Sequence, residues 1–85
     1  NNISELIIPN NVINIGTGAF LYNTLTSVDF GNGIETIGST AFAYNFLENG
    51  NAIIRRTPAS VNMGSNVFNN NGPTRTTTIT PTFIP

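Results

Sequence analysis

Apolar residues recur along this chain at the spacing of short strands separated by turns. Ile3, Leu6 and Ile8 are placed so that the last two alternate, as they would on one face of a β-strand. Residues 9–11, Pro-Asn-Asn, supply turn chemistry, since proline cannot extend a ladder and asparagine tolerates positive φ. After this turn, apolar residues recur three positions apart, at Val12 and Ile15. The pattern predicts short strands joined by turns and irregular chain, with no helix of ordinary length.

The same pattern returns 22 positions later. Residues 3–24 read ISELIIPNNVINIGTGAFLYNT, and residues 25–46 read LTSVDFGNGIETIGSTAFAYNF. Seven positions are identical in this alignment, and four more are conservative apolar matches. The identical pairs are Asn10/Asn32, Ile15/Ile37, Gly16/Gly38, Ala19/Ala41, Phe20/Phe42, Tyr22/Tyr44 and Asn23/Asn45. Agreement at this many positions identifies two copies of one structural repeat.

A third, longer copy follows residue 46. Residues 63–68, MGSNVF, match residues 37–42, IGSTAF, but lie 26 positions further on. Because Pro58 to Val61 resembles Pro9 to Val12, we place the extra residues mostly between Leu47 and Pro58, as a loop around residues 48–51. A fourth, partial unit begins near Pro73, and its threonine-rich run at 74–80 favours an edge strand. We expect one domain, residues 1–85, with repeats at about 3–24, 25–46 and 47–72 and a partial unit at 73–85, from a longer parent chain.

A repeat this short cannot bury its own apolar residues, so successive copies must stack and place like residues in columns. We also expect Asn23, Asn45 and Asn71, each three residues after a Phe, to satisfy backbone groups in the turns. The predicted columns are Leu6/Val28, Ile8/Phe30, Val12/Ile34/Val61, Ile15/Ile37/Met63 and Phe20/Phe42/Phe68.

Composition removes most catalytic and metal chemistry. The sequence has no His, Cys, Trp or Lys, which excludes imidazole, thiol and lysine mechanisms. Its four acids, Glu5, Asp29, Glu35 and Glu48, do not share a column, so we expect no carboxylate pair, no enzyme activity, no metal and no cofactor. A net charge of −1 argues against binding nucleic acid. No apolar run approaches the ~20 residues needed for membrane insertion.

The motif LxxLxLPxxVxxIGxxAF, present as ISELIIPNNVINIGTGAF and LTSVDFGNGIETIGSTAF, resembles the BspA-like leucine-rich repeats of bacterial surface proteins. The resemblance covers residues 3–46 and, in part, residues 57–72. It implies a leucine-rich-repeat solenoid of right-handed coils, with short parallel β-strands on the concave side and mostly irregular or 3-10 return segments. About three coils and a terminal strand are expected. It also implies a secreted or surface-attached bacterial protein that binds other macromolecules.

The outward positions of the concave strands are the expected contact surface, because the core occupies the inward ones. We expect Arg55 to pair with Asp29 across neighbouring strands, with Ile53 alongside. The predicted binding residues are Ser4, Glu5, Ile7, Thr26, Ser27, Asp29 and Arg55. Tyr22 and Tyr44 allow a sugar-binding platform, but packing along the coil edge with the hydroxyls in water is the simpler interpretation.

Two functions fit these expectations. The first is an extracellular or cell-surface protein-interaction and adhesion module without catalytic activity, whose partner is a protein or the extracellular matrix. The alternative is a structural spacer of a surface protein that binds nothing itself. Because neither end of the chain carries an obvious cap, we also expect end-to-end self-association.

Overall fold

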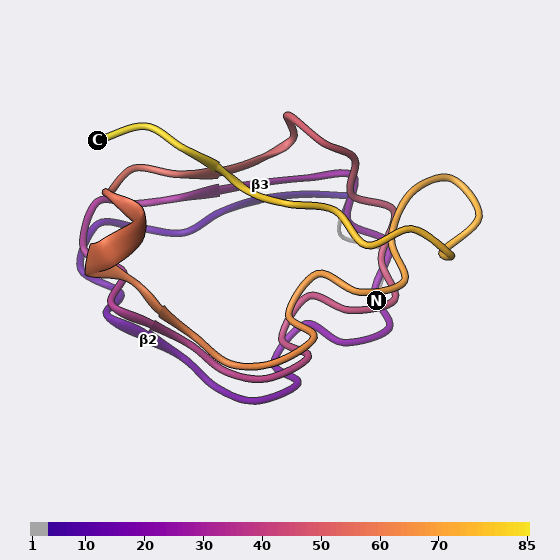
Figure 1. Cartoon of the computed structure of the whole chain (residues 1–85), viewed down its shortest axis with the longest axis horizontal. Coiled ribbons are helices and arrows are strands. Elements are labelled where there is room, and N and C mark those ends of the chain that lie inside the picture. Colours follow the sequence, from indigo (N-terminus) through magenta and orange to yellow (C-terminus); the bar gives the residue numbers. More distant parts are fainter. Residues whose placement is uncertain (1–3) are drawn as a thin grey trace.

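Residues 4–85 are described by this computed structural model, and within them seven short strands form two parallel sheets (Figure 1). The predicted apolar position Ile3 lies outside the described residues. The first sheet has the order β1-β3-β5-β7 and the second the order β2-β4-β6. The strands are β1 (Glu5–Ile7), β2 (Asn14–Ile15), β3 (Ser27–Phe30), β4 (Thr36–Ile37), β5 (Ala52–Ile54), β6 (Asn62–Met63) and β7 (Thr82–Phe83), and one 3-10 turn, η1, spans Pro58–Ser60.

Viewed as in Figure 1, the coils lie almost on top of one another, with the first sheet above and the second below. The chain is therefore a solenoid, as the repeat predicts. The return segments are mostly irregular, as expected, and the second sheet adds a two-residue strand to each of them. With a constant repeat length, the Asn14 and Thr36 positions come level in successive coils, so backbone hydrogen bonds form between coils there as well. Within the described residues, η1 is the one 3-10 segment.

The strand register shows how the third coil accommodates its extra residues. Glu5 pairs with Ser27 and Ile15 with Ile37, both 22 positions apart. Val28 pairs with Ala52, 24 positions apart, and Ile37 with Met63, 26 positions apart. Two extra residues therefore precede β5, at the predicted loop, and two more lie between β5 and β6, where η1 forms. Val61 is one residue out of step with Ile34 for the same reason, although it still packs against the core.

The predicted terminal strand exists, but its position was predicted wrongly. It is β7, after Pro81, and it pairs with β5 through Ile53–Thr82 and Ile54–Phe83. Residues 72–75 instead form a turn that is closed by an antiparallel bridge between Asn71 and Thr77, and residues 78–80 are irregular. The threonine-rich run offers one aliphatic anchor, Ile79, which is buried and donates its N–H to the Phe68 carbonyl at 3.3 Å. A strand needs an apolar face to pack, and Phe83 supplies that face for β7.

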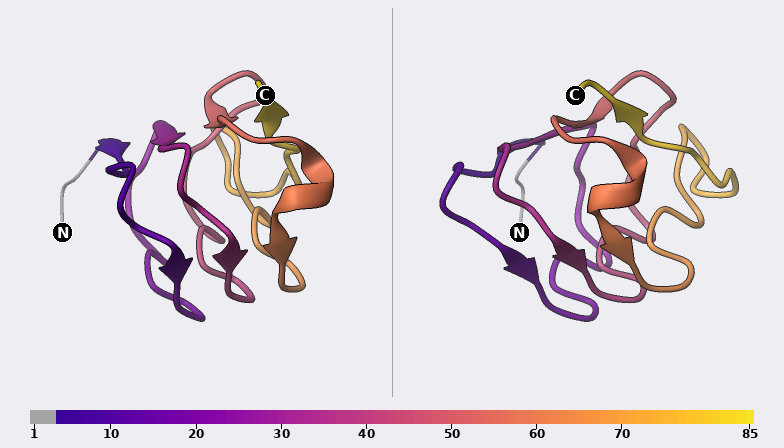
Figure 2. Two further views of the ribbon diagram at one scale, coloured as in Figure 1. Left: turned by 90° about the vertical axis from the view of Figure 1, so that its left-hand side faces the viewer. Right: turned by 60° about the vertical axis from the view of Figure 1, so that its left-hand side comes forward.

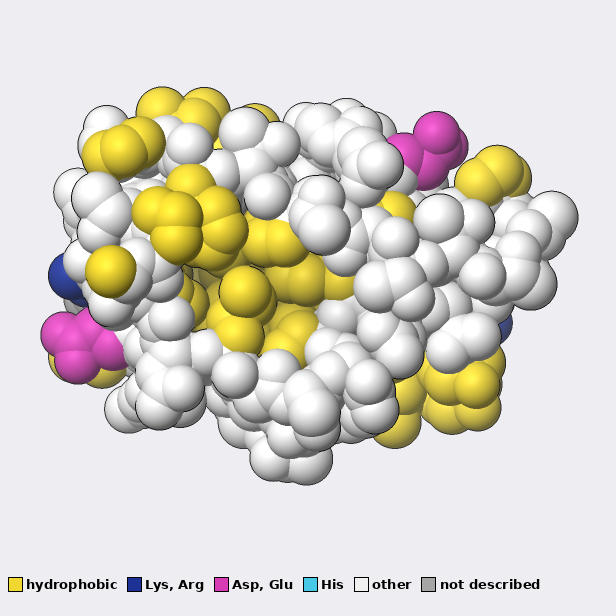
Figure 3. All heavy atoms as spheres, in the orientation of Figure 1, with side chains coloured by type: hydrophobic (Ala, Val, Ile, Leu, Met, Phe, Trp, Pro, Cys, Tyr) yellow, Lys and Arg dark blue, Asp and Glu magenta, His cyan; other side chains and the backbone are white. Residues whose placement is uncertain are grey.

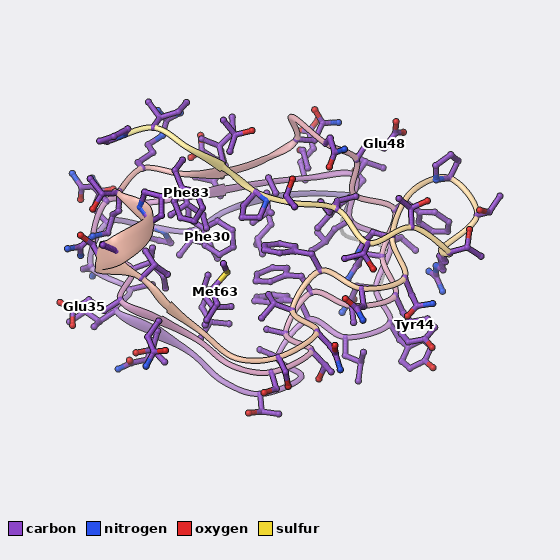
Figure 4. All side chains as sticks on the ribbon, viewed as in Figure 1. Phe30, Glu35, Tyr44, Glu48, Met63 and Phe83 are labelled. Atoms are coloured by element: carbon purple, nitrogen blue, oxygen red, sulfur yellow. The ribbon has the colours of Figure 1, made fainter. Side chains whose placement is uncertain are left out.

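Columns of like side chains fill the space between the two sheets. The rings of Phe20 and Phe42 stack at 5.2 Å and 15°, and those of Phe42 and Phe68 at 5.8 Å and 17°. The rings of Phe30 and Phe42 form a T-shaped pair, with 5.2 Å between centroids and 80° between planes. Phe30 and Phe42 are fully buried. Figure 4 shows Phe30 in the interior, between the two sheets. The Phe20/Phe42/Phe68 column is confirmed.

A second column consists of asparagines that join consecutive coils by hydrogen bonds. Asn45 is fully buried, and its Oδ1 accepts the Leu25 N–H at 3.0 Å. Its Nδ2 donates to the carbonyls of Phe20 at 2.9 Å and Phe42 at 3.2 Å. Asn71 makes the corresponding contacts one coil further on. Each of these two side chains thus pairs backbone groups that the irregular turn would otherwise leave buried and unpaired.

We predict that Asn45→Ala lowers the free energy of unfolding by roughly 2–4 kcal/mol, because it leaves the Leu25 N–H and at least one buried carbonyl without a hydrogen-bond partner. Urea denaturation monitored by circular dichroism measures the loss. Asn23→Ala is the comparison variant from the first coil, where the Asn23 side chain makes one hydrogen bond to the described residues, donating to the Leu21 carbonyl at 3.4 Å. Equal losses for the two variants would contradict a bridging role for Asn45.

Candidate functional site

The outward-facing side chains of β1, β3 and β5 form the candidate site, which we call the outer face. Alternation along β3 buries Val28 and Phe30 and leaves Ser27 and Asp29 facing outward. The parallel register then aligns Ile7, Asp29 and Ile53 in one row across the three strands. The repeat therefore decides which side chains are neighbours on this face, since residues distant in sequence become adjacent through the register alone.

A shallow, open depression of about 290 Å³ lies on the outer face. Four of the seven predicted binding residues line it: Glu5, Ile7, Ser27 and Asp29. Leu6, Val28, Gly50, Asn51 and Ile53 complete its lining. Of these, Ile53 was expected alongside the predicted set, whereas Gly50 and Asn51 were missed. Both come from the turn that the insertion before β5 lengthens, so the Asn49-Gly50 step was the sequence signal that could have located them.

The predicted pair between Asp29 and Arg55 is confirmed. Nε and Nη2 of Arg55 donate to the two carboxylate oxygens of Asp29, each at 2.9 Å. Both side chains remain well exposed, at 37% for Asp29 and 47% for Arg55. These hydrogen bonds, with the charge of the carboxylate, raise the pKa of Arg55 above its ordinary value. The bidentate geometry fixes the positions of both groups beside the depression.

Ser4 and Thr26 occupy a different place from the other predicted residues. The Thr26 hydroxyl and the Thr26 N–H donate to the Ser4 carbonyl, at 3.0 Å and 2.7 Å. These bonds join the first coil to the second at the start of their strands. Both residues are exposed, but neither lines the depression. Ser4 and Thr26 therefore stabilise the contact between the first two coils at the edge of the outer face.

Tyr22 and Tyr44 stack at the coil edge, at 4.4 Å between ring centroids and 16° between ring planes. The plainer interpretation, packing along the edge, fits this geometry, and Tyr22 remains 62% exposed. Both tyrosines have left-handed backbones, with φ of 59° and 58°. Asn70 has the same conformation at the equivalent place in the third coil, with φ of 56°.

The acidic side chains do not gather at one place in the structure. Figure 4 places Glu35 and Glu48 toward opposite ends of the long axis. Among residues 4–85, no group of three or more acidic side chains could hold a metal ion. Within the same residues, no helix is both long enough and apolar enough to cross a bilayer.

The family follows from a comparison with known proteins. A family model described as "BspA type Leucine rich repeat region (6 copies)" matches residues 1–84. The chain belongs to the BspA-type leucine-rich repeat family. The solenoid seen here is therefore a leucine-rich-repeat solenoid, of a family that is associated with bacterial surface proteins and is generally non-catalytic. No curated protein and no solved structure matches the chain significantly.

We predict weak, salt-sensitive coupling between Asp29 and Arg55. In a double-mutant cycle with Asp29→Asn and Arg55→Gln, urea denaturation should give a small favourable coupling at low salt, because the geometry is bidentate but exposed. Raising NaCl from about 20 mM to about 500 mM should reduce it, since screening shortens the range of exposed charges. Zero coupling at low salt, or coupling that salt leaves unchanged, would contradict the pair.

Proposed function

We propose that this chain is an extracellular or cell-surface protein-interaction module that acts in adhesion through the outer face and has no catalytic activity. The association of its family with bacterial surface proteins supports the location. The partner is a protein, such as a component of the extracellular matrix. The proposal rests on how the outer face distributes its apolar and polar groups.

One observation carries the proposal. Ile7 is 78% exposed and Ile53 is partly exposed, and they lie on either side of Asp29 in the same outward row. The core does not need these side chains, because Leu6 and Ile54 fill the inward positions beside them. Protein–protein interfaces have an apolar core that is surrounded by a polar rim. The two isoleucines resemble such a core, and the ion pair beside them resembles such a rim.

The shape of the depression supports a protein partner over a small molecule. At about 290 Å³ the space is at the lower limit for a ligand pocket, and it is shallow and open. An open surface of this kind suits one or two side chains that project from a larger partner. Glu5 on the same face has no ion pair within the described residues, so it offers a free acceptor to a polar or basic group.

The test is binding of purified extracellular-matrix proteins to the chain, which is immobilised at low density for surface plasmon resonance. Ile53→Thr should weaken binding about tenfold or more, because it removes an apolar anchor from the outward row beside Asp29. Threonine suits the strand, since Thr82 occupies the next position in the same row. The change should therefore leave folding intact.

Ile13→Glu is the matched control. Ile13 is 48% exposed and precedes β2 in the second sheet, away from the outer face. This variant should bind like the wild type. Equal binding by Ile53→Thr and the wild type would contradict the proposed site. A chain that binds no matrix protein would instead support the structural-spacer alternative.

A further inference from the structure

Three Asn-Gly steps occur in the sequence, at Asn32, Asn49 and Asn71. Asparagine is a chemically labile residue, and it loses its side-chain amide most readily when glycine follows. The glycine has no side chain to hinder the approach, so its backbone nitrogen can attack the amide carbon of the asparagine and close a five-membered ring. The three steps share this local chemistry and differ in what the fold places around them.

The fold protects Asn71. Its side chain is fully buried, its Oδ1 accepts the Leu47 N–H at 3.0 Å, and its Nδ2 donates to the Phe42 carbonyl at 3.0 Å. The Gly72 nitrogen would be the attacking atom, but its N–H donates to the Leu47 carbonyl at 2.7 Å. Ring closure at Asn71 would break these buried hydrogen bonds, so it requires local opening of the coil.

Asn32 is exposed, but its turn packs tightly against the coil before it. The Asn32 N–H donates to Oδ1 of Asn10 at 3.0 Å. A Cβ at Gly31 or at Gly33 would collide with Asn10, so the first coil lies against the backbone on both sides of Asn32. Ring closure needs rotation of this backbone to bring the glycine nitrogen to the amide carbon. The contact with the first coil restrains that rotation.

The turn of residues 48–51 is open by comparison. Figure 2 shows the segment before β5 projecting beyond the neighbouring coils. Asn49 and Gly50 are exposed, and a Cβ at Gly50 would meet no atom within 4 Å. The Gly50 N–H has no hydrogen-bond partner among residues 4–85. A hollow of about 230 Å³ adjoins Asn49, so water reaches its side chain.

A neighbouring N–H is placed to assist the reaction at Asn49. Oδ1 of Asn49 accepts the Thr80 N–H at 3.1 Å. Negative charge develops on this oxygen when the glycine nitrogen attacks the amide carbon, and a donor already in place stabilises that charge. The side chain of Asn32 accepts no such hydrogen bond from the described residues. Asn49 therefore combines a free attacking nitrogen with a stabilised oxygen.

We propose that Asn49 is a site of spontaneous deamidation, at which the chain converts asparagine to aspartate or isoaspartate. The Gly50 nitrogen gives up its proton to water and bonds to Cγ of Asn49. The Cγ–Nδ2 bond breaks, and the amide nitrogen takes up a proton and leaves as ammonia. Water then adds to either carbonyl of the ring and opens it. The net reaction consumes water, releases ammonia and leaves a carboxyl group that ionises.

Either product changes the rim of the depression on the outer face. Gly50 and Asn51 line the depression, and isoaspartate lengthens the backbone by a methylene directly before Gly50. Both products also add a negative charge next to Glu48, which Figure 4 labels. Figure 3, in the same orientation, draws the acidic side chain there among uncharged atoms. Deamidation therefore weakens partner binding by the outer face, an effect that rests on the proposed function.

Mass spectrometry with fragmentation that separates the three sites tests the proposal. The chain is incubated at mildly alkaline pH, folded and, in parallel, unfolded in guanidinium chloride. In the folded chain Asn49 should react about tenfold faster than Asn32, and Asn71 should stay unmodified. In guanidinium chloride the three sites should react at similar rates, because only the Asn-Gly chemistry remains. Equal rates at Asn49 and Asn32 in the folded chain, or modification of Asn71 before Asn49, would overturn the proposal.

Thr80→Pro tests the assisting donor, because it removes the N–H that Asn49 accepts. Residue 80 lies outside the strands, and circular dichroism checks that the variant folds. Deamidation of Asn49 should slow about tenfold, whereas Asn32 in the same molecule should react at its wild-type rate. An unchanged rate at Asn49 would contradict the role of the Thr80 N–H. For a variant that does not fold, the order of the sites in the wild type still decides the proposal.

Surface plasmon resonance with a matrix protein measures the effect on the outer face. The aged wild type should bind about tenfold more weakly than the fresh chain. Asn49→Gln is the matched control, since its longer side chain would have to close a six-membered ring, which forms more slowly. This variant should bind alike before and after ageing. Equal binding by aged and fresh wild type would contradict the effect on the outer face. Absence of binding by the fresh chain would contradict the proposed function, whereas the mass spectra decide deamidation independently.

Discussion

The structure depends on stacking between coils that cannot bury their own apolar residues. One coil of 22 residues contributes a few aliphatic side chains and one phenylalanine, which have no interior until a neighbour covers them. Register supplies that neighbour, since each residue meets its own equivalent above and below. Phe42 has a stacked ring on both sides, and Asn45 bonds to the coil before its own. Apolar packing and polar pairing thus both run along the solenoid axis.

The repeat also overrides local backbone preference. Thr40 and Tyr44 have φ of 56° and 58°, in the left-handed region that side chains with a Cβ disfavour. Gly18 takes the same conformation at the Thr40 position of the first coil, with φ of 66°. Hydrogen bonds to the next coil hold these turns, through the Thr40 N–H to Ser65 and the Tyr44 N–H to Asn69. Tertiary hydrogen bonding therefore fixes conformations that the residues themselves do not favour.

The parts of the structure that follow directly from the repeat could be predicted from the sequence. The phenylalanine column, the outward row on β3 and the Asp29–Arg55 pair all depend on register. The rest of the structure depends on interactions of residues that have no equivalent in the other repeats. The insertion in the third coil is divided between the turn before β5 and the segment that contains η1, and the terminal strand forms where Phe83 reaches the core. The lining residues Gly50 and Asn51 were missed for the same reason, because an inserted turn has no counterpart in the other coils.

The most direct measurement of the stacking is nuclear magnetic resonance of the chain with selectively labelled phenylalanine rings. Ring centroids at 5.2 Å and 5.8 Å predict nuclear Overhauser contacts from Phe42 to both Phe20 and Phe68. No direct contact between Phe20 and Phe68 is expected, since Phe42 lies between them. Loss of either Phe42 contact, or a direct contact between the two outer rings, would contradict the stacked core.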